Sequence, residues 1–411
     1  MGPITLFDKS FLQSLSLDES VWFDNFFLSN ISPLFFVETL ADLKKAIRAG
    51  RSPEDEVGII ADKTPEMNAY PNVFHMDLFI GSLQGNEIPM DGRIAVANGI
   101  PLQTADKSGF LIKSPPEMEA LSRWRERDFL AVERHFAQFW REIIISLKPE
   151  AGIEALNTLG VNYQQCRSIE TAKQISESFV DGIYTFPEIA KVLIVLFNAS
   201  PSFLNKSAQR WQQLNPQSLN SFAPYADYLL KIELFYFIAL ATGLISPVLS
   251  RNRIDLTYLF YLPFCMLFVS SDNFHKRCAP LFMRGNQLFV WGEDLKKDLG
   301  RLNTYYNELP EEAKKKGIYS IATRPPVEGD FLIAGIWDRF FPDWRKRYPS
   351  FMPKENPRLI REIEKFAEAI ANKKPSLDQE YLDPDAMIVE RKIRKKKGNW
   401  WLVPSDLVDK K

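Results

Sequence analysis

Short apolar runs that end in acidic residues are the clearest pattern in this chain. Residues 4–7 lead directly into Asp8, and residues 264–269 lead through two serines into Asp272. Runs of this length, bounded by polar residues, are typical of buried β-strands. A third apolar run, residues 287–291, predicts another strand. The pattern therefore indicates a sheet in which two strands each deliver a carboxylate at their carboxyl end.

Helical periodicity dominates most of the remaining sequence. It predicts one long helix over 117–147, a strongly apolar helix over 225–245, and shorter helices over 168–180, 186–198, 205–215, 256–262 and 273–282. Residues 54–115 are rich in Gly, Pro and Asp and predict a small, irregular segment that contains β-strands. Strands that alternate with helices indicate an α/β fold with a parallel sheet.

Composition narrows the class of protein without identifying a function. Of the 411 residues, 45% are hydrophobic, 25% are charged and 13% are aromatic, which excludes a largely disordered or fibrous chain. The net charge of −1 shows no overall basic excess of the kind that favours nucleic-acid binding. Three scattered cysteines form no CxxC pair, which favours a reducing compartment.

Neither a membrane span nor a signal peptide is indicated. The most apolar stretch, residues 229–245, contains Lys231 and Glu233, and the first residues lack a basic region. We therefore expect a cytoplasmic protein with no membrane partner.

Two further acids complete a candidate metal site. Glu38 lies in a helix-like segment, and Asp255 precedes Asp272 by 17 residues, which leaves room for one short helix and one strand. Ligands can meet at the carboxyl edge of a parallel sheet, and oxygen-only ligands suit Mg²⁺ or Mn²⁺. The alternative is that Asp8, Asp255 and Asp272 are N-caps of helices. Asp42, one turn after Glu38, is the rival for the second position.

The chain resembles the PIN domain family of metal-dependent ribonucleases in three segments. They are residues 4–10 (ITLFDKS), residues 36–43 (FVETLADL) and residues 255–272, which hold the late pair of acids. The resemblance implies a parallel sheet flanked by helices and hydrolysis of RNA phosphodiester bonds. It also implies a set of metal ligands, namely Asp8, Glu38, Asp255 and Asp272. Ser10 and Ser271 would be hydroxyls close to the metal, with Asp42 nearby.

Two departures from the family pattern affect the domain organisation and the chemistry. Lys9 stands where a small hydroxyl residue often follows the first acid, and 216 residues separate Glu38 from Asp255. We therefore expect a discontinuous catalytic core from 1–50 and 220–295, with 51–219 as a mostly helical insertion. Residues 296–411 would form a helical or irregular C-terminal extension with a basic tail.

Several candidate substrate contacts have alternatives. Arg251 and Arg253 could bind substrate phosphates or lie in a solvated loop. His275 could protonate a leaving oxygen or be a helix-surface residue. Residues 391–397, with six basic residues in seven, and the Trp pair 400–401 could bind RNA. The alternative is a solvated tail whose Trp pair docks on the body of the protein.

The sequence thus favours an endoribonuclease that depends on Mg²⁺ or Mn²⁺, with RNA as its substrate. The insertion could also bind a protein partner or an inhibitor. The alternative is a catalytically inactive PIN-like module that binds protein or RNA, because Lys9 could place an ammonium group where a cation would bind. A third interpretation is a different doubly wound α/β enzyme, in which Asp8 and Asp272 would lie far apart.

Overall fold

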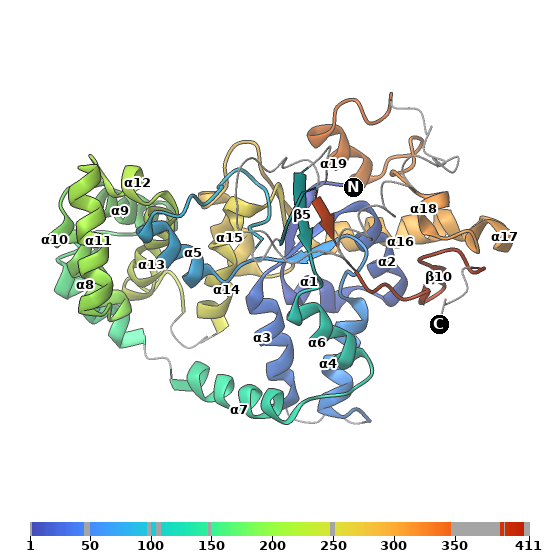
Figure 1. Cartoon of the computed structure of the whole chain (residues 1–411), viewed down its shortest axis with the longest axis horizontal. Helices are drawn as coiled ribbons and strands as arrows, with labels where there is room; N and C mark the ends of the chain where they lie inside the picture. The colour runs from blue at the N-terminus through green and yellow to red at the C-terminus, as the bar shows by residue number, and fades with distance from the viewer. Residues whose placement is uncertain are drawn as a thin grey trace.

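A five-stranded, fully parallel sheet forms the centre of the computed structural model (Figure 1). The structure describes residues 2–44, 50–96, 100–103, 108–146, 149–246, 251–346, 387–389 and 391–406. The strand order is β3-β2-β1-β6-β7. Their bounds are β1 (Ile4–Phe7), β2 (Leu28–Ile31), β3 (Ala69–Pro71), β6 (Leu267–Ser270) and β7 (Leu288–Trp291). The expected α/β class and parallel sheet are confirmed.

Strands β1 and β6 are neighbours although they come from distant parts of the sequence. Leu6 pairs with Phe268 and Phe7 pairs with Val269 in parallel register. Because side chains alternate between the two faces of a strand, Leu6 and Phe268 enter one hydrophobic core while Phe7 and Val269 enter another. The sheet is therefore buried on both faces, as parallel sheets usually are.

Helices cover both faces of the sheet. One core is shared with α13 (Pro224–Ala241), α14 (Arg251–Leu259), a 3₁₀ turn (Leu262–Phe264) and α15 (Asn273–Phe282). The other core is shared with α1 (Lys9–Ser14), α2 (Leu17–Phe26), α3 (Pro33–Ala41), α4 (Pro53–Lys63), α16 (Gly292–Asn307) and α19 (Leu332–Phe340). A 3₁₀ turn, Asp42–Lys44, follows α3.

Two strands differ from the expected domain organisation. The polar residues Ser29 and Asn30 give no strand signal in the sequence, yet β2 runs through them and ends at Ile31. Its buried Asn30 side chain is hydrogen-bonded: the amide donates to the Phe264 carbonyl oxygen (2.8 Å) and accepts from Asn72 (3.1 Å). Strand β3 lies within residues 51–219, so the central sheet takes a strand from the segment that we expected to be wholly inserted.

A lobe of helices lies at one end of the molecule, to the left in Figure 1. It contains α5 (His75–Gln84), α8 (Pro149–Leu159), α9 (Ile169–Asp181), α10 (Phe186–Phe197), α11 (Pro201–Leu214), α12 (Leu219–Phe222) and α13. Within α13, both Lys231 and Glu233 are ion-paired, to Asp227 and Arg253 respectively. In the part of the chain that the structure describes, no helix is long and apolar enough to cross a bilayer.

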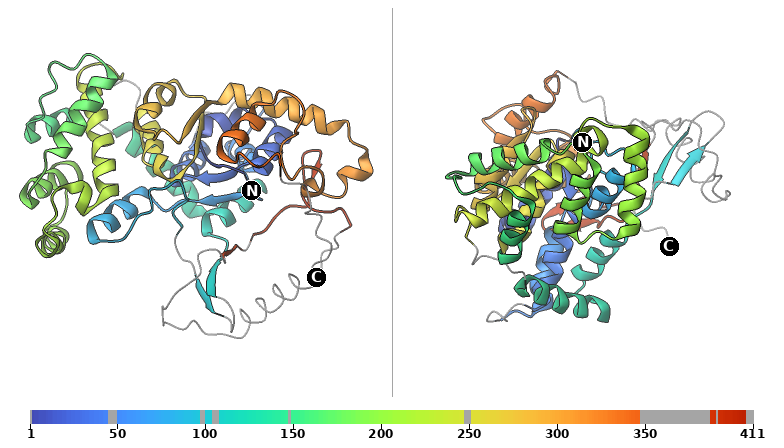
Figure 2. Two further views of the ribbon diagram at one scale, coloured as in Figure 1. Left: turned by 90° about the horizontal axis from the view of Figure 1, so that it is seen from above. Right: turned by 90° about the vertical axis from the view of Figure 1, so that its left-hand side faces the viewer.

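The long helix expected over 117–147 is two helices, α6 (Pro116–Arg125) and α7 (Ala131–Ser146). They are separated at Arg127, which has a positive φ of 60°. The expected β-containing segment includes β4 (Ile100–Gln103) and β5 (Ser108–Ile112), which form a small sheet with β8 (Met387–Val389). Figure 2 shows that this sheet stands away from the main body.

The C-terminal part begins with α16 and adds two short helices, α17 (Glu311–Lys314) and α18 (Ile318–Ile321), before α19. A final hairpin pairs β9 (Lys396–Lys397) with β10 (Trp400–Trp401). Trp400 is buried against Trp22 of α2, with ring centroids 4.6 Å apart. Among the described residues of this part, 296–346 and 391–406 therefore contribute to the core beside the central sheet.

Candidate functional site

The carboxyl ends of β1 and β6 bring Asp8 and Asp272 to the same edge of the sheet. The Asp8 amide donates to the Val269 carbonyl oxygen (3.2 Å), which extends the strand pairing by one residue. Each aspartate also caps a helix: Asp8 accepts from the Phe11 amide (2.8 Å) and Asp272 from the Phe274 amide (2.7 Å). The two interpretations from the sequence are therefore compatible, because both acids are N-caps at the expected edge.

Asp8 is the centre of a buried hydrogen-bond network. Its Oδ2 accepts from the hydroxyls of Ser10 (2.7 Å) and Ser270 (2.6 Å). The Ser270 Oγ lies 2.8 Å from Nδ1 of His275 and also accepts from the Asp272 amide (3.0 Å). His275 Nδ1 is itself 3.4 Å from Asp8 Oδ2. Ser10 is thus in the expected position beside the first acid.

His275 is a buried cation at this edge. Its side chain is completely buried, and its Nε2 lies 2.8 Å from the Asp255 carbonyl oxygen, which can only accept. Burial alone would lower the pKa of His275, but the hydrogen bond and the charge of Asp8 raise this pKa to about 9. Burial would likewise raise the pKa of Asp8, but the contact with His275 lowers it. An imidazolium therefore faces a carboxylate at neutral pH.

Glu38 and Asp42 approach the edge from α3 and the turn that follows it. The Tyr258 hydroxyl donates to Glu38 Oε2 (2.5 Å), and burial raises the pKa of Glu38 although Lys9 opposes this shift. The Lys9 ammonium donates to the Glu38 carbonyl oxygen (2.8 Å) and forms an ion pair with Asp42 (2.7 Å). Asp42 is therefore engaged by Lys9, whose ammonium contacts both Glu38 and Asp42.

Asp255 lies in the middle of α14, which begins at residue 251, so it is not the helix cap that the sequence suggested. Its Oδ2 is buried and has no hydrogen-bond partner among the residues that the structure describes. Burial raises the pKa of Asp255 to about 8; His275 opposes this shift, and the charges of Glu38, Asp272 and Asp8 add to it. The four predicted acids therefore lie close enough to interact electrostatically.

We refer to Asp8, Glu38, Asp255, Tyr258, Ser270, Asp272 and His275 as the Asp8 cluster. Three of its members, Tyr258, Ser270 and His275, were not predicted for these roles. His275 was the nearest to being found, since it follows the capping Asp272 by three residues and so lies on the same face of α15.

Two other predicted residues, Ser271 and Arg253, lie away from Asp8 or are already engaged. The Ser271 hydroxyl has no hydrogen-bond partner among the described residues and lies close to Gly292, whereas the hydroxyl of its neighbour Ser270 contacts Asp8. Arg253 forms a two-pronged ion pair with Glu233 (2.5 and 2.6 Å), so its guanidinium is committed to that acid. The side chain of Arg251 lies outside the described residues.

The donor chemistry of the Asp8 cluster fits a hard divalent cation, since its four acids offer only oxygen. The unpartnered Oδ2 of Asp255 is a free ligand atom, whereas both oxygens of Asp8 already accept hydrogen bonds. Within the described ranges, no group of three or more His, Cys, Asp or Glu side chains is arranged so that it could hold a metal ion. Binding would therefore require Asp8 or Glu38 to exchange a present hydrogen bond for the metal.

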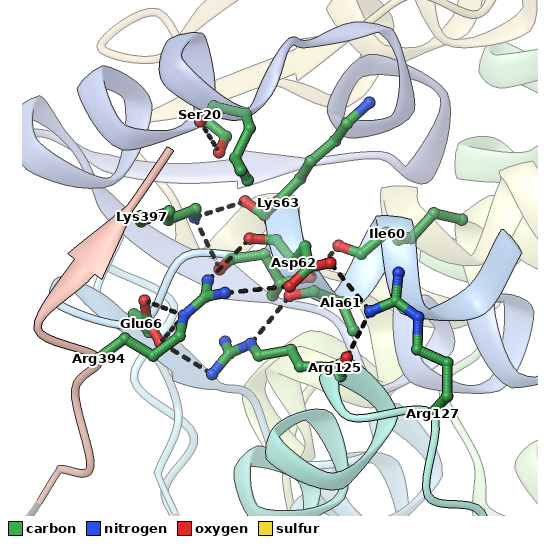
Figure 3. Close-up of polar contacts among 12 residues, drawn as sticks. Ser20, Ile60, Ala61, Asp62, Lys63, Glu66, Arg125, Arg127, Arg394 and Lys397 are labelled. Atoms are coloured by element: carbon green, nitrogen blue, oxygen red, sulfur yellow. Dashed lines mark hydrogen bonds and ion pairs between the residues drawn. The ribbon is translucent and has the colours of Figure 1, made fainter. Parts of the chain in front are cut away.

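Three basic residues of the tail, Arg391, Arg394 and Lys397, are bound to the body of the protein. Arg394 pairs with Glu66 and with Asp62 (both 3.0 Å), as Figure 3 shows. Arg391 donates to the Met67 carbonyl oxygen. The buried Lys397 ammonium donates to the carbonyl oxygens of residues 63 and 64 (3.1 and 3.3 Å). Together with Trp400, these contacts favour the docked tail over an RNA-binding tail.

Comparisons of the chain with protein-family models, with curated proteins and with solved structures found no match.

Proposed function

We propose that this protein hydrolyses RNA phosphodiester bonds with a divalent cation, Mg²⁺ or Mn²⁺, held by Asp8, Glu38, Asp255 and Asp272. The observation that carries the proposal is the convergence of these four acids from four elements, with one buried oxygen of Asp255 unpartnered. When bound, the cation would polarise the scissile phosphate and lower the pKa of an attacking water. The choice of RNA rests on the resemblance to PIN domains.

The residues around Asp8 have a positioning role in this proposal. Two hydroxyls and one amide fix the Asp8 carboxylate, so one orientation is already selected before a cation binds. His275 and Lys9 each contribute a positive charge that limits repulsion among the acids when no cation is present. Such preorganisation reduces the cost of assembling a charged site.

The experiment compares cleavage of a labelled single-stranded RNA by the wild type, Asp8→Asn and a matched surface control, Asp330→Asn. Asp330 is exposed and lies far from the cluster in sequence. We expect Mn²⁺-dependent cleavage by the wild type and the control, abolition by EDTA, and a loss of at least about a hundredfold in Asp8→Asn. Equal cleavage by all three proteins, or cleavage that survives EDTA, would contradict the proposal.

The positive side chains of His275 and Lys9 favour a second candidate function, that of an inactive interaction module. Because His275 and Lys9 already provide positive charge beside the acids, the fold could serve as an inactive interaction module. Titration calorimetry with Mn²⁺ separates the two. Binding that Asp255→Asn weakens supports the nuclease, whereas a folded wild type that binds no Mn²⁺ supports the module.

A further inference from the structure

A cavity of about 580 Å³ lies beside the outer strand β3, away from the Asp8 cluster. Its walls come from three separate parts of the chain: residues 66–70, the segment 114–125 that includes α6, and the docked residues Arg391 and Lys392. Volumes of this size are typical of sites for small molecules. None of the residues of the proposed metal site lines it.

The walls of this cavity carry an excess of positive charge. Four cationic side chains and two carboxylates line it, namely Arg123, Arg125, Arg391 and Lys392 against Glu66 and Glu119. Two of the cations have acidic partners, since Arg123 pairs with Glu133 and Arg125 with Glu66 (both 2.8 Å). Arg391 and Lys392 form no ion pair within the described part of the chain, so the excess remains at the cavity.

Arg125 supplies the most deeply buried of these charges. Only 5% of its side chain is exposed. Its Nε donates to the Ala61 carbonyl oxygen (3.1 Å) and its Nη1 contacts Glu66, as Figure 3 shows. Its Nη2 has no hydrogen-bond partner among the described residues. A buried donor without a partner is costly, and an acceptor in the cavity would remove that cost.

The rest of the wall is suited to an organic group. Tyr70, Pro115 and Met118 provide apolar surface, while Ser114 and Ser122 provide hydroxyls. The cavity thus combines a cationic part with an apolar part, which is the usual composition of a site that orients a small ligand.

We propose that this cavity binds a small phosphate monoester, with its phosphate near Arg125, Arg391 and Lys392. Its organic part would contact Tyr70, Pro115 and Met118. A phosphate monoester carries nearly two negative charges at neutral pH, which suits Arg391 and Lys392, the two lining cations without an ion-pair partner among the described residues, better than a single carboxylate does. Its oxygens also suit the fork of donors that a guanidinium presents.

Because three separate segments of the chain line the cavity, a bound ligand would link them to one another. Because Arg391 and Lys392 belong to the C-terminal segment and Tyr70 belongs to β3, a bound phosphate ester would hold that segment against the edge of the sheet. Ligand binding should therefore raise the unfolding temperature of the full chain.

Adenosine monophosphate is the probe, and titration calorimetry of the full chain in EDTA is the measurement. Adenosine and inorganic phosphate are tested beside it. We expect AMP to bind more tightly than either, and Lys392→Glu to weaken AMP binding by about tenfold through charge reversal. The matched control is Lys396→Glu, which changes an exposed lysine in the same segment outside the cavity and should leave the affinity unchanged.

The Asp8→Asn variant makes this test independent of the proposed nuclease. Its affinity for AMP should equal that of the wild type, since Asp8 does not line the cavity. The proposal is overturned if AMP does not bind, if adenosine or inorganic phosphate binds as tightly as AMP, or if Lys392→Glu and Lys396→Glu have equal effects. A loss of AMP binding in Asp8→Asn would also overturn it, because it would place the nucleotide at the Asp8 cluster.

Discussion

Two groups of charges in this protein, each with a buried centre, are built in opposite ways. The Asp8 cluster joins four acids to one imidazolium and leaves Asp255 Oδ2 without a partner. The second group, which we call the Glu66 cluster, consists of Glu66, Asp62, Arg125, Arg394 and Lys397 (Figure 3). In the Glu66 cluster each acid contacts at least one guanidinium. Its residues come from three segments that are distant in sequence: 62–66, Arg125 and 394–397.

The difference indicates which group maintains the fold and which is available for chemistry. In the Glu66 cluster both carboxylates are ion-paired, and removing one partner of a buried pair leaves the other charge uncompensated. A group of acids with too few cations instead creates a demand for positive charge. Substitutions in the Glu66 cluster should therefore affect stability first, whereas substitutions in the Asp8 cluster should affect function first.

The largest expected loss of stability comes from Glu66→Gln. The buried guanidinium of Arg125 would lose its carboxylate, and the partly exposed Arg394 would keep only its pair with Asp62. We therefore expect the free energy of unfolding to fall by about 3–5 kcal/mol. Urea unfolding of the full chain measures this change. The control is Glu312→Gln, which removes an exposed ion pair with Lys315 and should leave the midpoint unchanged. If Glu66→Gln and Glu312→Gln unfold at the same urea concentration, the Glu66 cluster does not stabilise the fold more than a surface ion pair does.

Trp400→Ala should give the next largest loss of stability. We expect the free energy of unfolding to fall by about 3 kcal/mol, because the Trp400 side chain fills a buried site. Its indole donates to Asn303 Oδ1 (2.9 Å), which also accepts from Trp22 (3.0 Å). The neighbouring Trp401 is half-buried and provides the control. If Trp401→Ala destabilises the protein as much as Trp400→Ala, the docking of the C-terminal hairpin is not specific to Trp400.

The smallest effect concerns the pH dependence of stability at His275. Its pKa of about 9 in the folded protein exceeds the usual 6.5, so its stabilisation is complete below pH 6.5 and is lost as pH rises through 9. The shift corresponds to at most about 3 kcal/mol. In EDTA, the stability difference between the wild type and His275→Gln should therefore shrink between pH 6 and pH 9.5. A difference that is constant or grows over this range would show that the imidazolium does not stabilise Asp8.

The sequence predicted those parts of the fold whose signal is local. The apolar runs around β1, β6 and β7 mark buried strands because each is short and is bounded by polar residues. Asp8 and Asp272 could be placed at one edge because parallel strands end together. The buried helix α13 was recognisable from its nearly continuous apolar surface.

Features that depend on remote partners were missed for a physical reason. Ser29 and Asn30 make β2 look like a loop, and only the distant Phe264 carbonyl oxygen and Asn72 allow the Asn30 amide to be buried. His275 looked like a surface residue because its contact with the Asp255 carbonyl oxygen comes from another helix. In the same way, nothing near Arg394 in the sequence indicates its pairing with Glu66.

The pairing of β1 with β6 has a consequence for how the protein is made. Thr5 and Leu267 are paired but lie 262 residues apart, so a ribosome that adds about 5–20 residues per second completes this contact roughly 10–50 s after β1 emerges. During that interval the inner edge of β1 is an unpaired, apolar strand edge, which is a hazard for aggregation. The growing chain therefore needs the early helices or a chaperone to shield β1 until β6 arrives.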